Sequence, residues 1–125
     1  MKLTNYTIYN TAQKLNSAFT ERNQYLPAKI NFFIQKNAAT LAAPAEEIEK
    51  SRIIIIKHYG KENPETGDYT IPEDEQDKLA MMKELEDLFS IEQELNIHMI
   101  NIDAFGDVEL SIEQMNSIMF MVEGE

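Results

Sequence analysis

Two histidines, His58 and His98, are the side chains of this sequence best suited to acid–base chemistry. A catalytic histidine needs a nucleophile beside it or a carboxylate that orients it, and neither histidine stands in such a motif. The chain also has no cysteine that could act as a nucleophile. Two distant carboxylates could still form an acid–base pair, but no spacing in the sequence selects one. The sequence therefore predicts a protein that is not an enzyme.

Carboxylates cluster at residues 46–49 and 73–77, and such groups can ligate a metal ion. Each cluster is also typical of the acidic residues that stabilise the positive end of a helix. No pair of histidines has the spacing of a zinc site, and the four glycines are too scattered to build a phosphate-binding loop. We therefore expect no metal ion and no cofactor.

Charge is distributed unevenly along the chain, whose formal net charge is −11. Residues 1–61 hold 9 basic and 4 acidic side chains, a balance of +5. Residues 62–125 hold 2 basic and 18 acidic side chains, a balance of −16. The net field repels phosphates, which disfavours free duplex nucleic acid as a partner. A basic partner protein, or a local basic pocket, is compatible with this distribution, and so are acidic faces that only keep the protein soluble.

Basic and polar side chains lie close together in a predicted helix, at Lys29, Asn31 and Lys36, where acidic residues are absent. Such a surface can hold a carboxylate, a phosphate or an acidic partner helix. With Arg52 and Lys57, these residues form the candidate site for a host or phage protein or a small anionic ligand. The alternative is that the surface docks internally against the acidic half of the chain.

The elements that would position these residues follow from hydrophobic spacing. An amphipathic helix is predicted over residues 4–20, with Thr4 or Asn5 as its N-cap, and a polar connection follows at residues 21–24. The apolar side of this helix has spacings of four, three and four, at Ile8, Ala12, Leu15 and Phe19.

A second helix is predicted to begin with Pro27 at its first position and to end at Gly60 in the left-handed conformation. Pro44 stands inside this pattern. Because an interior proline costs ~3 kcal/mol, we expect a break or a sharp kink near it.

Four consecutive isoleucines at residues 53–56 cover every side of one helical turn. Such a turn is buried all round or lies at a subunit interface, and the β-branched run also fits a strand over residues 53–59. We expect a homo-oligomer whose interface contains Ile53, Ile54, Ile56 and Tyr59.

Turn residues at 63–68 predict a loop, followed by a short strand at 69–71. A helix is then predicted from Pro72, with acids in its first turn. Its apolar stripe contains Leu79, Met82, Leu85 and Phe89.

The last part of the chain changes period. Residues 96–104 are predicted to form a strand that pairs with residues 108–110 through a turn at Gly106-Asp107. Ser111 and Gln114 predict a capping box that starts a last helix through Val122. Six methionines in this half of the chain either fill the core or form an adaptable surface for a partner.

Together these elements predict a mainly α fold, a small helical domain of four to five helices with a short β-hairpin or minor sheet. We expect one domain over residues 1–125, with a basic half at 1–61 and an acidic half at 62–125. No apolar run reaches the ~20 residues that span a bilayer, and no signal-peptide pattern follows Met1. The sequence therefore predicts a soluble, cytoplasmic protein without a membrane partner.

Several segments resemble a group of small, uncharacterised phage and prophage proteins. The likeness rests on Lys2-Leu3-Thr4-Asn5-Tyr6, Leu26-Pro27-Ala28-Lys29-Ile30-Asn31-Phe32, Gln35-Lys36-Asn37 and the predicted last helix at residues 110–123. The resemblance implies a virus-encoded accessory protein in the cytoplasm of a bacterial host, and it brings no active site.

Two functions are compatible with these observations. The first is a non-enzymatic interaction protein that binds or sequesters a host factor or an anionic ligand, for instance as an inhibitor of host defence. The second is a component of virion assembly that acts as a homo-oligomer.

Overall fold

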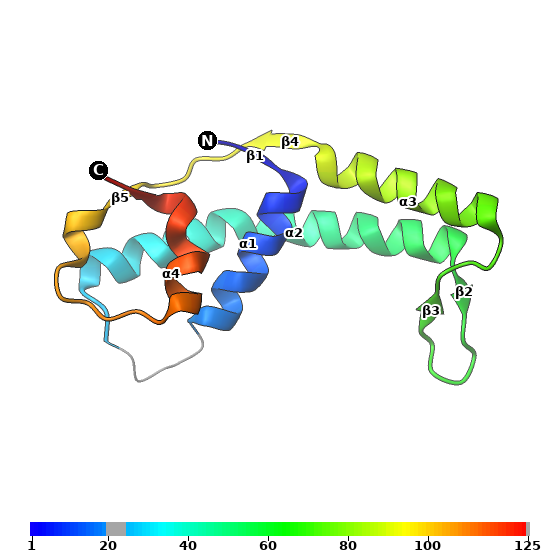
Figure 1. The fold of residues 1–125 in the computed structure, drawn as a ribbon, viewed down its shortest axis with the longest axis horizontal. Coiled ribbons are helices and arrows are strands. Elements are labelled where there is room, and N and C mark those ends of the chain that lie inside the picture. The colour runs from blue at the N-terminus through cyan, green and yellow to red at the C-terminus, as the bar shows by residue number, and fades with distance from the viewer. Residues whose placement is uncertain (20–24, 125) are drawn as a thin grey trace.

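Helix α2 (Ala28–Tyr59) runs along the length of the protein and carries the other helices (Figure 1). The computed structural model describes residues 1–19 and 25–124. Within them, α1 (Asn5–Ala18) packs across the first part of α2, and α4 (Ile112–Ile118) packs against α1. Helix α3 (Glu75–Ser90) runs antiparallel beside the second half of α2. We call α1, α4 and the first part of α2 the head, and α3 with the second half of α2 the arm. The predicted mainly α fold is confirmed.

Short strands pair at three places in the described residues. β1 (Lys2–Thr4) pairs antiparallel with β4 (Glu92–Glu94), with Leu3 opposite Gln93. The hairpin of β2 (Lys61–Glu62) and β3 (Tyr69–Thr70) stands at the far end of the arm (Figure 1) and contains the predicted short strand. In the head, β5 (Ile100–Asn101) runs parallel to β6 (Val122–Glu123).

The predicted pairing of residues 96–104 with residues 108–110 is wrong. The chain leaves the extended conformation at a 3₁₀ helix, Ile102–Phe105, whose first turn is capped by the Asn101 side chain accepting from the Asp103 amide at 2.8 Å. The partner of Ile100 is Val122, in the segment predicted to be helical. The last helix consequently ends earlier than predicted and passes through a second 3₁₀ turn, Met119–Met121, into β6.

The helix starts follow the predicted local signals. Thr4 caps α1 by accepting from the Thr7 amide at 3.2 Å, and Ile8 and Leu15 bury the apolar side of that helix. Ser111 and Gln114 form the predicted capping box at the start of α4. Helix α1 ends at Ala18, with Phe19 as its C-cap, slightly before the predicted end at residue 20. The polar connection predicted at residues 21–24 lies outside the described residues.

Helix α2 continues through Pro44, so the predicted break is wrong. Leu41 and Ile48 lie on either side of the proline and are 0% and 2% exposed in the same core. Burial of two such side chains contributes about 1.5–3 kcal/mol each, which outweighs the cost of about 3 kcal/mol for an interior proline. The segment at residues 53–59 is accordingly part of a helix and not a strand.

Replacement of Pro44 by alanine is expected to raise the free energy of unfolding by about 1–2 kcal/mol. Alanine restores the amide that α2 lacks at this position, and part of this gain is offset because the unfolded chain becomes more flexible. Urea denaturation followed by circular dichroism measures the change. A loss of stability in this variant would show that packing of the proline ring outweighs the restored hydrogen bond.

Helix α2 ends at Gly60, as predicted, but in an extended conformation with φ −78° and ψ 165°. The predicted left-handed cap is therefore wrong. Glycine is required here for a different reason, because a Cβ atom would lie 2.6 Å from the Ile56 carbonyl oxygen and 2.9 Å from that of Thr70. The close approach lets the hairpin fold back onto the end of α2. At the other end of α2, Pro27 precedes the first helical residue instead of occupying it.

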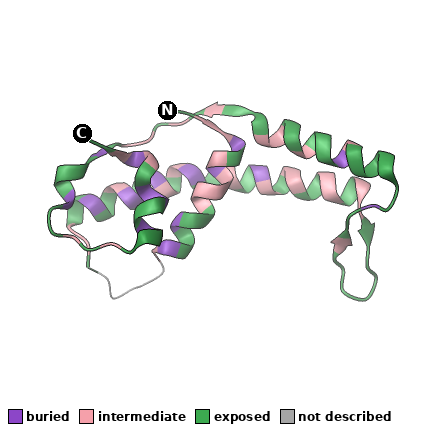
Figure 2. Cartoon of the chain, viewed as in Figure 1, coloured by how far each residue is buried: buried purple, intermediate pink, exposed green. Residues whose placement is uncertain are grey.

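The core lies in the head, where α1, α2 and α4 meet, whereas most residues of the arm are exposed or half-buried (Figure 2). Its fully buried members include Ile8, Ile30, Leu41, Ile118 and Met121. An arm of only two helices has no second layer to cover its outer faces. Apolar side chains that lie on those faces therefore stay accessible to a partner.

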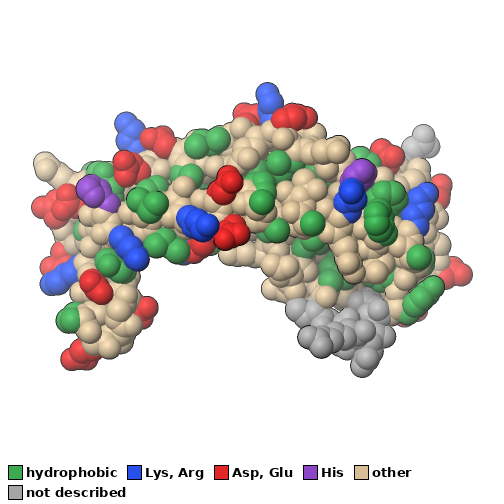
Figure 3. Space-filling view, turned by 180° about the vertical axis from the view of Figure 1, so that it is seen from behind, with side chains coloured by type: hydrophobic (Ala, Val, Ile, Leu, Met, Phe, Trp, Pro, Cys, Tyr) green, Lys and Arg blue, Asp and Glu red, His purple; other side chains and the backbone are tan. Residues whose placement is uncertain are grey.

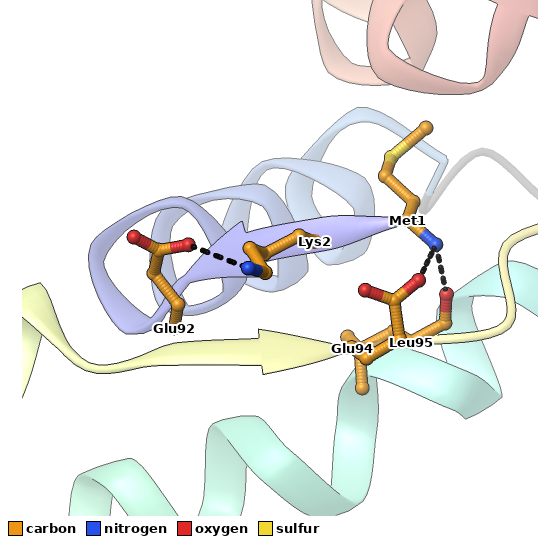
Figure 4. Close-up of polar contacts among 5 residues, drawn as sticks. All are labelled: Met1, Lys2, Glu92, Glu94 and Leu95. Atoms are coloured by element: carbon orange, nitrogen blue, oxygen red, sulfur yellow. Dashed lines mark hydrogen bonds and ion pairs between the residues drawn. The ribbon is translucent and has the colours of Figure 1, made fainter.

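The first strand is tied to the segment after α3 by charged groups (Figure 4). The amino group of Met1 donates to the Glu94 carboxylate and to the Leu95 carbonyl, each at 2.8 Å, and its hydrogen bond lowers the pKa of the Glu94 carboxyl. Lys2 Nζ lies 3.9 Å from Glu92. Among the described residues these two ion pairs join the basic half to the acidic half. They involve exposed carboxylates and contribute little stability.

Candidate binding surfaces

The predicted binding residues all lie on α2, but they do not form one site. Lys29 and Lys57 are separated by 28 residues, which corresponds to roughly 40 Å along a helix. Lys29, Asn31 and Lys36 belong to the head, and Arg52 and Lys57 belong to the arm. The structure therefore separates the first three from the other two. It also places Asn31 on a different side of α2 from Lys29 and Lys36, because two residues correspond to about 200° around a helix.

Lys29 and Lys36 are exposed and share one face of α2, because seven residues correspond to nearly two helical turns. Phe32 stands between them on the same side and is 59% exposed, with Lys36 Nζ 6.0 Å from the centre of its ring. Neither lysine forms an ion pair within the described part of the chain. We call Lys29, Phe32 and Lys36 the lysine–aromatic surface.

The lysine–aromatic surface has a rigid support. The ring of Phe32 contacts Phe33 edge to face with ring centres 5.7 Å apart, and Phe33 stacks on His98 at 5.5 Å. Asn31 does not belong to this surface. It lines a pocket with Leu15 and Phe19 of α1, and its side-chain oxygen accepts from Gln35 at 3.3 Å. The sequence did not identify Phe32 as an exposed binding residue, because an aromatic residue at helical spacing is usually part of a core.

Asn37 is a buried structural residue of α2, although it directly follows the exposed Lys36. It is 0% exposed, its Nδ2 donates to the His98 carbonyl at 2.8 Å, and its Oδ1 accepts from the His98 amide at 2.8 Å. One side chain thus satisfies both peptide groups of His98 and holds the segment before β5 against α2. The described contacts of His98 are thus the hydrogen bonds from its backbone to Asn37 and the stacking of its ring on Phe33, and neither neighbour is a nucleophile.

Arg52 is engaged within the protein. Its Nε and Nη2 donate to the two carboxylate oxygens of Glu49 at 3.0 and 2.6 Å, and the Tyr9 hydroxyl donates to the same carboxylate. The hydrogen bonds from Arg52 and then Tyr9 lower the pKa of the Glu49 carboxyl, and the bond to Glu49 raises the pKa of Tyr9. This group joins α1 to the arm, so Arg52 is less accessible to a ligand than Lys29 or Lys36.

The residues of the predicted isoleucine interface lie on the arm and differ in their exposure. Ile54 is 68% exposed and Ile53 is 37% exposed, whereas Ile56 and Tyr59 are half-buried. The turn is therefore not buried all round. Lys57 lies near the hairpin, with its Nζ 5.9 Å from the centre of the Tyr69 ring.

Helix α3 buries the predicted stripe only in part. Met81 is the residue of α3 that is buried, whereas Leu79 and Met82 of the predicted stripe are 58% and 54% exposed. Leu85 and Phe89, also in that stripe, are half-buried and line an open groove of about 530 Å³ between α1 and α3. We call Leu79, Met82, Leu85 and Phe89 the α3 stripe. It joins the groove to the outer part of the arm.

Charged side chains of both signs are interspersed on the face shown in Figure 3, and its basic groups do not merge into one patch. Within residues 1–19 and 25–124, no three histidine or carboxylate side chains are grouped so that they could hold a metal ion. None of the described helices combines the length and the apolarity that crossing a bilayer requires.

The chain matches no known protein-family profile, no curated protein and no solved structure. Its function is therefore inferred from these surfaces.

Proposed function

We propose that the protein is a non-enzymatic interaction protein that binds an acidic segment of a host or phage protein through the lysine–aromatic surface. The observation that supports this most is an exposed phenylalanine between two lysines without ion pairs on a rigid helix. Two ammonium groups can bind carboxylates, and an aromatic ring contributes apolar contact area next to them.

The size and charge of the surface favour a short protein segment over a nucleic acid. Two lysines can neutralise only a few carboxylates, and the net charge of −11 repels a long polyanion during its approach. The resemblance to phage proteins makes a bacterial host factor, including a component of host defence, the partner of first interest. Binding by this surface would block or sequester that factor without any chemical step.

The proposal is tested by fluorescence anisotropy with labelled peptides that combine glutamates and aspartates with leucines. We expect saturable binding that weakens as salt rises, because exposed charges are screened. Lys29→Glu with Lys36→Glu should raise the Kd by at least about tenfold, and Phe32→Ala should raise it by a smaller factor.

A matched control changes the same number of charges elsewhere. Lys14→Glu with Lys61→Glu alters two exposed lysines away from the lysine–aromatic surface and should leave the Kd within about twofold. Equal binding by the Lys29/Lys36 variant and the control variant would remove the proposed surface. Tighter binding of single-stranded DNA than of every acidic peptide would show that the partner is a nucleic acid and not an acidic protein segment.

A further inference from the structure

The part of the α3 stripe at Leu79 and Met82 is an apolar helix face that the rest of the described chain leaves exposed. Leu79 and Met82 are more than half exposed, and Tyr6, which lines the adjoining groove, is 63% exposed. Phe89 already packs against Tyr9, with ring centres 5.5 Å apart. The open part of the face is therefore centred on Met82, between Leu79 and Leu85.

The residues around Met82 form a self-complementary pattern. Three residues before and after it stand Leu79 and Leu85, and four residues before and after it stand Lys78 and Glu86. Spacings of three and four place all of these on the side of the helix that Met82 occupies. When two identical helices pack antiparallel and cross at the same residue, a residue that precedes the crossing point in one helix lies next to the residue that follows it by the same number in the other. Such a contact pairs leucine with leucine and lysine with glutamate.

We infer that the α3 stripe is the interface of a homodimer, in which α3 packs antiparallel on α3 of a second copy about a two-fold axis at Met82. A two-fold axis repeats each contact, so Lys78 meets Glu86 of the second copy twice in one interface. Within the described part of a single chain, neither Lys78 nor Glu86 forms an ion pair. Charge complementarity thus favours a second copy over an unrelated apolar helix.

The two copies bury Met82 against Met82 and Leu79 against Leu85, and Tyr6 flanks the end of the contact. The interface differs from the isoleucine turn predicted from the sequence. One helix pair gives a small contact, because stable interfaces bury ~1,600 Å² in total. The dimer is therefore expected to be weak and to form with rising protein concentration. It does not depend on the lysine–aromatic surface, so either proposal can fail alone.

Charge exchange at Lys78 and Glu86 tests the proposed register. In sedimentation equilibrium, the apparent mass of the unchanged protein should rise from 14.4 kDa toward twice that value as the concentration increases. Lys78→Glu and Glu86→Lys should each raise the dimer Kd by about tenfold, because each places like charges together twice. The double variant Lys78→Glu with Glu86→Lys should return close to the original Kd. Lys61→Glu, with the same charge change on the β2–β3 hairpin, should behave like the unchanged protein.

The outcomes separate the register from dimerisation itself. A protein that stays monomeric at every concentration overturns the inference. A dimer whose double variant is as weak as the single variants overturns the two-fold register at Met82. Circular dichroism of each variant establishes that helix content is unchanged.

A cysteine substitution provides a second measurement that does not depend on surface charge. The chain has no cysteine, so Met82→Cys introduces one thiol, and the axis places it beside the same thiol of the second copy. Oxidation with diamide removes the two thiol hydrogens and should yield a covalent dimer. Lys61→Cys, on the β2–β3 hairpin, should remain mostly monomeric. Equal cross-linking of both variants would contradict the proposed interface.

Discussion

Replacement of Asn37 by alanine is expected to lower the free energy of unfolding by about 2–4 kcal/mol. The substitution leaves the His98 amide and carbonyl without the two 2.8 Å hydrogen bonds that Asn37 now supplies. It also opens a small cavity, because the side chain is 0% exposed. Chemical denaturation monitored by circular dichroism measures the change.

Asn31 provides the matched control for this substitution. It is an exposed asparagine six residues earlier on the same helix, so Asn31→Ala should change the stability by less than about 0.5 kcal/mol. Comparable stabilities of the Asn37→Ala and Asn31→Ala variants would show that water replaces the lost hydrogen bonds to His98.

Replacement of Leu41 by alanine is expected to cost about 2–5 kcal/mol. Leu41 is 0% exposed and belongs to the core that α2 shares with α1, so the lost methyl groups leave a cavity that rigid helices cannot close. The same denaturation experiment measures the loss. A cost below about 1 kcal/mol would show that the head relaxes around the smaller side chain.

The same chemical change at Leu79 separates burial from side-chain type. Leu79 is 58% exposed, so Leu79→Ala should change the stability of the dilute, monomeric protein by less than about 0.5 kcal/mol. A large effect at Leu79 would show that the predicted stripe is covered in solution, in contrast to the arrangement of α3 described above.

Signals that act over a few residues predicted much of the fold. The cap at Thr4 and the capping box at Ser111 each depend on hydrogen bonds within one helical turn. Helix α3 begins at Glu75, three residues after the predicted start at Pro72, and its cap at Asp74 is equally local. Such interactions form whatever the rest of the chain does, so the sequence contains all the information needed.

Features that depend on distant parts of the chain were predicted wrongly. The path of α2 through Pro44 depends on the burial of Leu41 and Ile48 in a core that α1 and α4 complete. The pairing of Ile100 with Val122 joins residues 22 apart, and it replaced a hairpin that short-range turn rules favoured. Propensity and turn chemistry contain no term for these long-range contacts.

The candidate surfaces were predicted in part for the same reason. The sequence grouped Lys29, Asn31 and Lys36 on one surface, and the structure places only the two lysines on one face of α2. No spacing rule distinguishes an exposed Phe32 from a buried aromatic residue. In α3, apolar residues occupy more than half of the helix circumference. Periodicity alone could therefore not decide whether Met81 or Met82 faces α2.

Because α2 is continuous, it fixes the distance between the surfaces at its two ends. Its 32 residues form one rod of roughly 48 Å, with the lysine–aromatic surface near one end and the β2–β3 hairpin at the other. A molecule held at the first end is thereby kept at a constant separation from anything that touches the second. Inserting or deleting whole helical turns in α2 would lengthen or shorten this separation in steps of about 5.4 Å.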